Sequence, residues 1–266
     1  LAGCGRSGPG PQGPPGQSRL ILFVAIGVAL GLSLGLFGGG GGILAIPLLV
    51  AAGVPTDEAG TTSLIVVGLG ALGGLVNHAR AGRVAWREGL LFSALGAAGA
   101  IAGSWLALAT RDEVQLWGFA LVLVAAGGLM LRTSLRGGSE PTAHSRRALS
   151  VVVTTAFVVG LFTGFFGVGG GFLVVPALTL ILGMAMHEAA ATALLVITLN
   201  CGFALIPRAG QALDLRATLI VTASVILTSA VAARWAGKWS ARNLGIGFAC
   251  LVLAMSVLTV VQAASA

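Results

Sequence analysis

Long apolar stretches separated by short polar turns run through most of this chain. Most of them have about 20 residues, the length that a helix needs to cross a hydrocarbon core of about 30 Å. The pattern predicts unbroken helices at about 59–77, 88–109, 113–131, 189–206, 214–236 and 242–263. We therefore expect an all-α polytopic membrane protein.

Two further apolar segments, at about 20–52 and 149–182, are interrupted by glycine clusters. As one straight helix the first would be on the order of 50 Å long, which exceeds the hydrocarbon core. Glycine favours a break because it has little helical preference and reaches positive φ without steric cost. The chain must therefore turn, tilt or re-enter at each cluster.

The two interrupted segments are copies of one pattern, which indicates an internal duplication. Gly31, Gly35, Phe37 and Gly38 match Gly160, Gly164, Phe166 and Gly167, and the likeness continues through Gly53 and Gly183, Glu58 and Glu188, and Thr62 and Thr192. We expect about eight transmembrane segments in two homologous halves, each beginning with a glycine-broken helix. The expected units are a disordered tail at 1–18, a first repeat at 19–131, a cytoplasmic linker at 132–148 and a second repeat at 149–266.

Composition agrees with a membrane protein and excludes most other classes. The chain is 56% hydrophobic and 9% charged, with a mean hydropathy of +1.00. The net charge of +7 is carried by turns and linkers, so it requires no nucleic-acid partner. The three cysteines lack metal-ligand spacing, and we expect neither a zinc site nor another cofactor.

The basic residues give two possible orientations, because cytoplasmic loops are enriched in Lys and Arg. If each broken segment crosses once, four of the 15 Lys and Arg lie on one side and 11 on the other, and both termini are cytoplasmic. If each crosses twice, the division is 10 to 5 and the termini lie outside. One crossing predicts halves related by an axis along the membrane normal, and two crossings predict an inverted repeat. We favour one crossing.

Paired glycine breaks at corresponding positions are typical of transporter binding sites. Free N–H groups at broken helix ends, and the partial positive charge there, suit a small anion. The hypothetical anion site consists of Gly40, Gly41, Gly42, Gly169, Gly170 and Gly171, with hydrogen bonds from Thr61, Thr62, Ser63, Thr192 and Asn200.

Each of these residues also has a purely structural interpretation. The glycines can serve close helix packing or a kink, and the threonines can cap their helices. Asn200 is better explained as a hydrogen-bonding residue between helices. The five tryptophans are typical anchors at the membrane interface.

Enzymatic chemistry is not indicated. All acidic, basic and histidine residues fall in expected loops or helix ends, so no carboxylate is placed for a proton relay at the membrane centre. The glycine runs lack the Lys-Ser/Thr of a phosphate-binding loop and the strand that precedes a dinucleotide site.

The chain resembles the TauE/SafE family of sulfite-exporter-like permeases. The resemblance covers about residues 20–263 and rests on the glycine motifs, the Glu-x-x-x-Thr helix starts and the turns Arg80-Ala81-Gly82 and Arg208-Ala209-Gly210. In the family an Asp often follows this turn; Asp214 fits, whereas the first half has Ala85-Trp86.

The resemblance implies a secondary transporter or facilitator for sulfite, a sulfonate or another small anion, in a bacterial inner membrane that it crosses several times. The alternative is a membrane subunit or assembly factor that does not transport. The anion, the direction of transport and the oligomeric state stay open.

Overall fold

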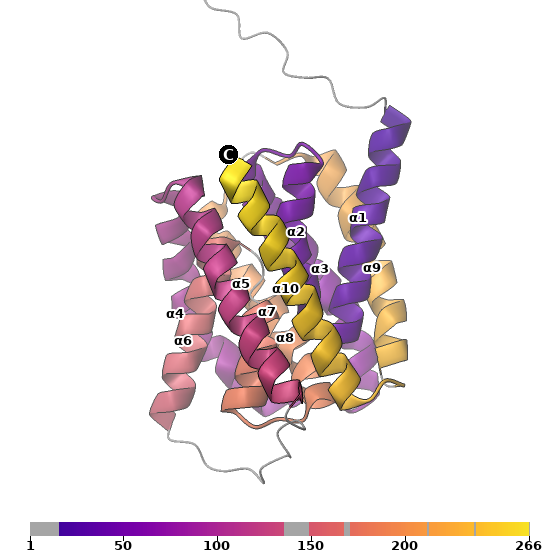
Figure 1. Ribbon diagram of the computed structural model, residues 1–266, viewed down its shortest axis with the longest axis vertical. Helices are drawn as coiled ribbons and strands as arrows, with labels where there is room; N and C mark the ends of the chain where they lie inside the picture. Colours follow the sequence, from indigo (N-terminus) through magenta and orange to yellow (C-terminus); the bar gives the residue numbers. More distant parts are fainter. Residues whose placement is uncertain (1–15, 136–148, 168–170, 212, 237, 266) are drawn as a thin grey trace, which may run out of the picture.

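The structure is a computed structural model that describes residues 16–135, 149–167, 171–211, 213–236 and 238–265. The described residues form helices and no strands (Figure 1). The elements are α1 (Gly16–Phe37), α2 (Gly40–Ala51), α3 (Thr56–Arg80), α4 (Trp86–Leu108), α5 (Asp112–Leu135), α6 (Leu149–Phe166), α7 (Gly171–Pro176), the π-helix η1 (Ala177–Ile181), α8 (Met186–Leu205), the 3₁₀-helix η2 (Ile206–Arg208), α9 (Leu215–Ala236) and α10 (Ala241–Ser265). The expected disordered tail lies largely outside the described residues, and α5 continues to Leu135, past the expected start of the linker.

Most of the described helices suit a membrane. Seven are long and apolar enough to cross one, and α6 has 18 residues. α2 and the segment 171–181 are shorter apolar helices. All five tryptophans are exposed and lie near helix ends. Trp86 and Trp105 are separated by about 29 Å along α4 at 1.5 Å per residue, close to the thickness of a hydrocarbon core.

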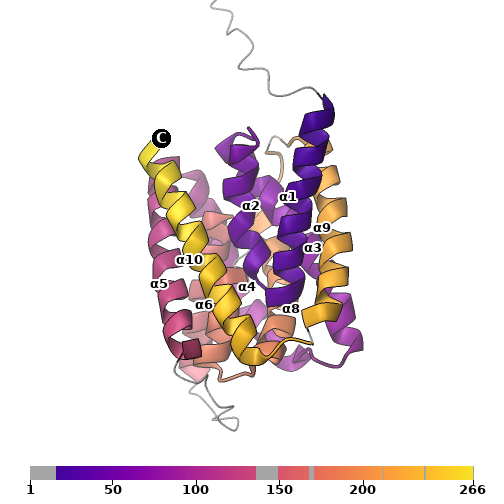
Figure 2. The same ribbon diagram turned by 45° about the vertical axis from the view of Figure 1, so that its right-hand side comes forward.

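The first glycine break reverses the direction of the chain. A Cβ on Gly41 would lie 2.7 Å from the carbonyl oxygen of Leu30 and would overlap the Leu34 side chain, so the start of α2 lies back against α1. Both α1 and α2 therefore open onto the face where the two ends of the described chain lie (Figures 1 and 2). We call this face the terminal face. α6 and α7 form the equivalent hairpin from the opposite face, where α5 ends and α6 begins, which we call the linker face.

The favoured single crossing of each broken segment is therefore wrong. A continuing helix would place Gly41 about 10 Å beyond Leu34, because seven residues rise 1.5 Å each. Each half instead contains a hairpin and three long helices, and the two hairpins enter from opposite faces. The halves are thus inverted repeats.

Each half packs its first helix against the fourth helix of the other half. α1 lies along α9, and α6 lies along α4. The backbones touch, since a Cβ on Gly31 would lie 2.8 Å from the carbonyl oxygen of Val225 and a Cβ on Gly160 would overlap that of Gly96. Gly99 and Gly103 of α4 likewise lie directly against the backbone of α6.

Left-handed backbone positions show the duplication directly. Six described glycines have φ between 65° and 95°, and no other described residue type has positive φ. They occur at equivalent positions of the two halves, as the pairs Gly38 and Gly167, Gly53 and Gly183, and Gly82 and Gly210. The sequence repeat is therefore also a repeat of backbone conformation.

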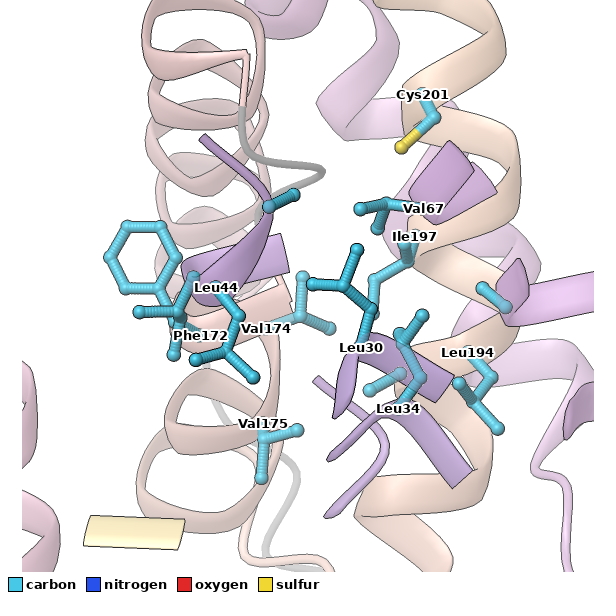
Figure 3. Close-up of a cluster of buried hydrophobic side chains, with 14 of the residues drawn as sticks. Leu30, Leu34, Leu44, Val67, Phe172, Val174, Val175, Leu194, Ile197 and Cys201 are labelled. Carbon is cyan, nitrogen blue, oxygen red and sulfur yellow. The ribbon is translucent and has the colours of Figure 1, made fainter. Parts of the chain in front are cut away.

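The core lies where both hairpins meet the central helices α3 and α8 (Figure 3). Leu34 and Leu44 come from the first hairpin, Val174 from the second, and Ile197 from α8. All four are buried. Both hairpins therefore pack into one apolar core.

Candidate functional site

The two hairpin tips touch each other at the centre of the molecule. A Cβ on Gly171 would lie 2.6 Å from the carbonyl oxygen of Gly39, and a Cβ on Gly39 would overlap that of Gly171. The positive-φ glycine at each hairpin tip packs against the other half. Gly38 lies against Ala190 in α8, and Gly167 lies against Gly60 in α3. Gly60 and Ala190 occupy equivalent positions, so the crossing has approximate two-fold symmetry.

Four of the six glycines of the predicted anion site are described and buried, and the other two lie outside the described residues. Gly40, Gly41 and Gly42 are buried at the start of α2, which has no side-chain cap. Gly40 lies against Ser33 and Leu251, so this glycine and Gly41 serve close packing in this structure. Gly171 is buried at the crossing, and Gly169 and Gly170 lie outside the described residues.

A cavity of about 240 Å³ opens beside the second hairpin. It is lined by elements that end or begin at the terminal face, and Phe166 at the hairpin tip contributes to its wall. Phe119 of α5 faces Phe166 with ring centroids 5.3 Å apart. The volume is below that of pockets for drug-sized ligands, which favours a small solute. The other polar and apolar lining residues are Ile46, Gly60, Ala107, Leu108, Thr110, Gln115, Leu116, Arg208 and Gln211.

Arg208 is the basic residue of this cavity, and it is only 7% exposed. Its Nη2 donates to the carbonyl oxygen of Gly164 at 3.3 Å, and its Nε has no hydrogen-bond partner. A Cβ on Gly60 would lie 2.8 Å from Nη1, so the absent side chain makes room for the guanidinium. Within the described part of the chain, no carboxylate forms an ion pair with Arg208.

Three consecutive hydroxyl side chains lie close to this cavity in sequence, directly after Gly60. Thr61, Thr62 and Ser63 are buried in the second turn of α3, and none of their hydroxyl oxygens has a hydrogen-bond partner. They do not cap α3, whose N-cap residue is Pro55. Their hydrogen-bonding capacity is thus free in this conformation.

The other two residues of the predicted anion site, Thr192 and Asn200, lie in α8. Thr192 accepts a hydrogen bond from the backbone N–H of Ala85 at 3.0 Å, which ties α8 to the turn before α4. Asn200 is fully buried next to Gly96, and neither amide atom has a partner. Asn200 therefore does not join two helices by a hydrogen bond in this conformation, contrary to the preferred interpretation.

A second cavity, of about 290 Å³, lies at the linker face between the turn after α3 and the start of α8. Its lining includes Arg83, His187 and Glu188. Near Arg83 and His187 lies His78, which is 3% exposed and lies next to the backbone of Gly35. The described residues contain no cluster of three or more His, Cys, Asp or Glu side chains that could hold a metal ion.

Sequence reasoning missed Arg208 and His78. Both fall at helix ends, where charged side chains ordinarily reach water, and only tertiary packing buries them. The available signal for Arg208 was the repeated Arg-Ala-Gly turn together with Gly60, whose counterpart in the second half is Ala190.

Comparison with known proteins identifies the family of this chain. Residues 23–259 match the family model described as Sulfite exporter TauE/SafE. A "Probable membrane transporter protein" of Xylella fastidiosa is 37% identical over 183 residues, which cover 67% of this chain and 69% of that protein. "Probable membrane transporter protein YunE" of Bacillus subtilis is 28% identical over 204 residues, covering 68% and 74%. No solved structure matches the chain. The chain is a polytopic membrane protein that belongs to the sulfite exporter TauE/SafE family.

Proposed function

We propose that this protein is a secondary transporter or facilitator for a small anion, and that Arg208 binds the anion from the terminal face. The observation that carries the proposal is a buried guanidinium at a cavity beside a broken helix, without a carboxylate partner among the described residues. Burial of an unpaired charge is costly, so a transient counter-ion stabilises such a site.

The surroundings of Arg208 favour an anion as that counter-ion. The Nε–H is free to donate, and Arg forms strong charge-assisted hydrogen bonds with oxyanions. α3 begins near the cavity, and its N-terminal end contributes partial positive charge. The free hydroxyls of Thr61 and Thr62 can donate further hydrogen bonds as the anion moves toward the hairpin crossing.

The family name directs the choice of anion. Sulfite and sulfonates are compact oxyanions that suit a cavity of about 240 Å³ with one guanidinium. We therefore propose sulfite, a sulfonate or a related sulfur-containing or organic anion as the substrate.

We also propose that the linker face is cytoplasmic and that the protein lies in the plasma membrane. Among the described residues, seven Lys and Arg lie at the linker face and four at the terminal face, which meets the positive-inside rule. The first set is Arg80, Arg83, Arg87, Arg132, Arg234, Lys238 and Arg242, and the second is Arg19, Arg111, Arg208 and Arg216.

The test is anion binding and flux with the purified full-length protein. Melting temperatures are compared in sulfite, sulfate, taurine, lactate and chloride at fixed ionic strength, because a ligand of the folded state stabilises it. Uptake of the stabilising anion is then measured in proteoliposomes. We expect Arg208→Gln to lose both the stabilisation and the uptake, and Arg216→Gln, an exposed control on the same face, to keep both.

Gly60→Ala provides a second perturbation that leaves the charge in place. The new Cβ would occupy the space next to Arg208 Nη1, so we expect weaker anion binding although the arginine is retained. Uptake by Arg208→Gln at the wild-type rate would contradict the proposed role of Arg208. Absence of flux for every anion would instead support a subunit that does not transport.

A further inference from the structure

The two cavities are related by the same approximate two-fold symmetry as the hairpins. At the terminal face, the turn after α8 (206–211) meets the start of α3 at Gly60. At the linker face, the turn after α3 (82–84) meets the start of α8 (185–188). Each cavity is therefore built from the turn of one half and the helix start of the other half.

The cavities differ in depth. The terminal-face cavity reaches Phe166 at the tip of the second hairpin and its partner Phe119. The equivalent aromatic pair is Phe37 and Phe248, with ring centroids 6.2 Å apart, and neither ring lines the linker-face cavity. Among the described residues, the terminal-face cavity thus reaches a hairpin tip and the linker-face cavity does not, and we refer to the terminal face as open and to the linker face as closed.

The two faces also differ in one hydrogen bond. At the closed linker face, Thr192 Oγ1 accepts the N–H of Ala85, the residue that precedes α4. The equivalent hydroxyl at the open face belongs to Thr62, which is buried and has no hydrogen-bond partner.

Aligning the two halves shows which backbone N–H group would correspond, for Thr62, to the N–H of Ala85 that Thr192 accepts. Gly160 packs against the Gly96 carbonyl, and the equivalent Gly31 packs against the Val225 carbonyl, so α4 and α9 correspond with an offset of about 129 residues. The residue that precedes α9, and that corresponds to Ala85, is Asp214.

We propose that Thr192 and Thr62 are alternate latches of the two cavities. Thr192 holds the linker-face cavity closed by its bond to Ala85. When that bond opens, Thr62 accepts the backbone N–H of Asp214 and closes the terminal-face cavity. One threonine–backbone hydrogen bond thus breaks at one face while its equivalent forms at the other. The two arrangements are the two states that access from alternating sides requires. The inference rests on the proposed function because the cavity that closes is the one assigned to the anion.

The latches are tested by the accessibility of two reporter cysteines in a background without Cys4, Cys201 and Cys250. Ala107 lines the terminal-face cavity and is 5% exposed, and its equivalent, Ala236, lies at the linker-face end of α9 and is 2% exposed. Ala107→Cys and Ala236→Cys are labelled separately with a membrane-impermeant maleimide, applied to vesicles of each orientation in a buffer that contains no sulfite, sulfonate or carboxylate substrate.

Thr192→Val keeps the shape of the side chain and removes the acceptor. We expect it to raise the labelling rate of the cysteine at 236 by about fivefold and to lower that of the cysteine at 107, as loss of one net hydrogen bond shifts a two-state equilibrium by about this factor. Thr62→Val should shift both rates in the opposite direction. Thr192→Ser, which keeps the hydroxyl, should restore the wild-type rates.

An unchanged rate at 236 in Thr192→Val would overturn the latch, as would equal increases at both reporters or the same response to both valine variants, since these indicate general loosening. The labelling assay does not depend on substrate binding. An unaltered labelling rate would therefore contradict the latch without contradicting the role of Arg208 in anion uptake.

Discussion

Replacing Gly38 by alanine tests whether the hairpin crossing determines the fold. Gly38 has φ of 72°, and a Cβ there would overlap the carbonyl oxygen of Ala190. Gly53 has φ of 86°, and a Cβ there would have no neighbour within 4 Å. The two alanine variants therefore share the backbone strain and differ only in the collision with α8.

The two costs can be estimated separately. A left-handed alanine costs about 1–2 kcal/mol, partly offset by about 0.4–1 kcal/mol from lost freedom in the unfolded chain, so Gly53→Ala should destabilise by about 1 kcal/mol. Gly38→Ala adds about 1–3 kcal/mol for forcing two backbones apart. For a chain of this size each kcal/mol lowers the melting temperature by about 2–4 °C.

The assay is thermal unfolding of the purified variants in one detergent, with Gly167→Ala as an intermediate case. A Cβ on Gly167 would lie 3.1 Å from Gly60 Cα, a contact that a small shift can relieve. The expected order of melting temperature is Gly53→Ala, then Gly167→Ala, then Gly38→Ala as the lowest. Equal losses for Gly38→Ala and Gly53→Ala would refute the crossing as a tight backbone contact.

Three further predictions concern helix packing and buried polar groups. Gly103→Ala should lower the melting temperature because its Cβ would overlap the Leu161 carbonyl, whereas Gly128→Ala, in open space on α5, should raise stability by up to about 1 kcal/mol through helix propensity. Asn200→Leu should not lower the melting temperature, since its amide makes no hydrogen bond; a clear loss would restore a bridging role. Ser104→Ala should destabilise by about 1 kcal/mol in a denaturant titration because its hydroxyl donates to the Ala204 carbonyl at 2.7 Å, and an unchanged midpoint would exclude that contribution.

The sequence predicted the membrane class, the duplication and the position of each break, because these depend on local hydrophobicity and glycine content. It did not determine the direction of the chain after each break. The same glycines permit a kink or a reversal, and the reversal is decided by contacts such as Gly39 with Gly171, which are more than 100 residues apart in the sequence.

The candidate site shows the same division. Thr61, Thr62 and Ser63 were identified because hydroxyls in an apolar helix are conspicuous, and they are indeed buried without partners. Arg208 was not identified, although its motif was. Its burial depends on the absence of a side chain at Gly60, and the equivalent Arg80, whose counterpart position carries Ala190, is exposed.

The exchange of helices between the halves has a consequence for biosynthesis. Gly27 in α1 packs against Ser224 in α9, so the partner of the first helix is made 197 residues later. At about 5–20 residues per second this interval lasts on the order of ten to forty seconds. During that time the glycine-rich face of α1 has only lipid or other proteins beside it. Before the second half is made, the five helices of the first half lack their neighbours from that half, and quality control in the membrane must tolerate this intermediate on every round of synthesis.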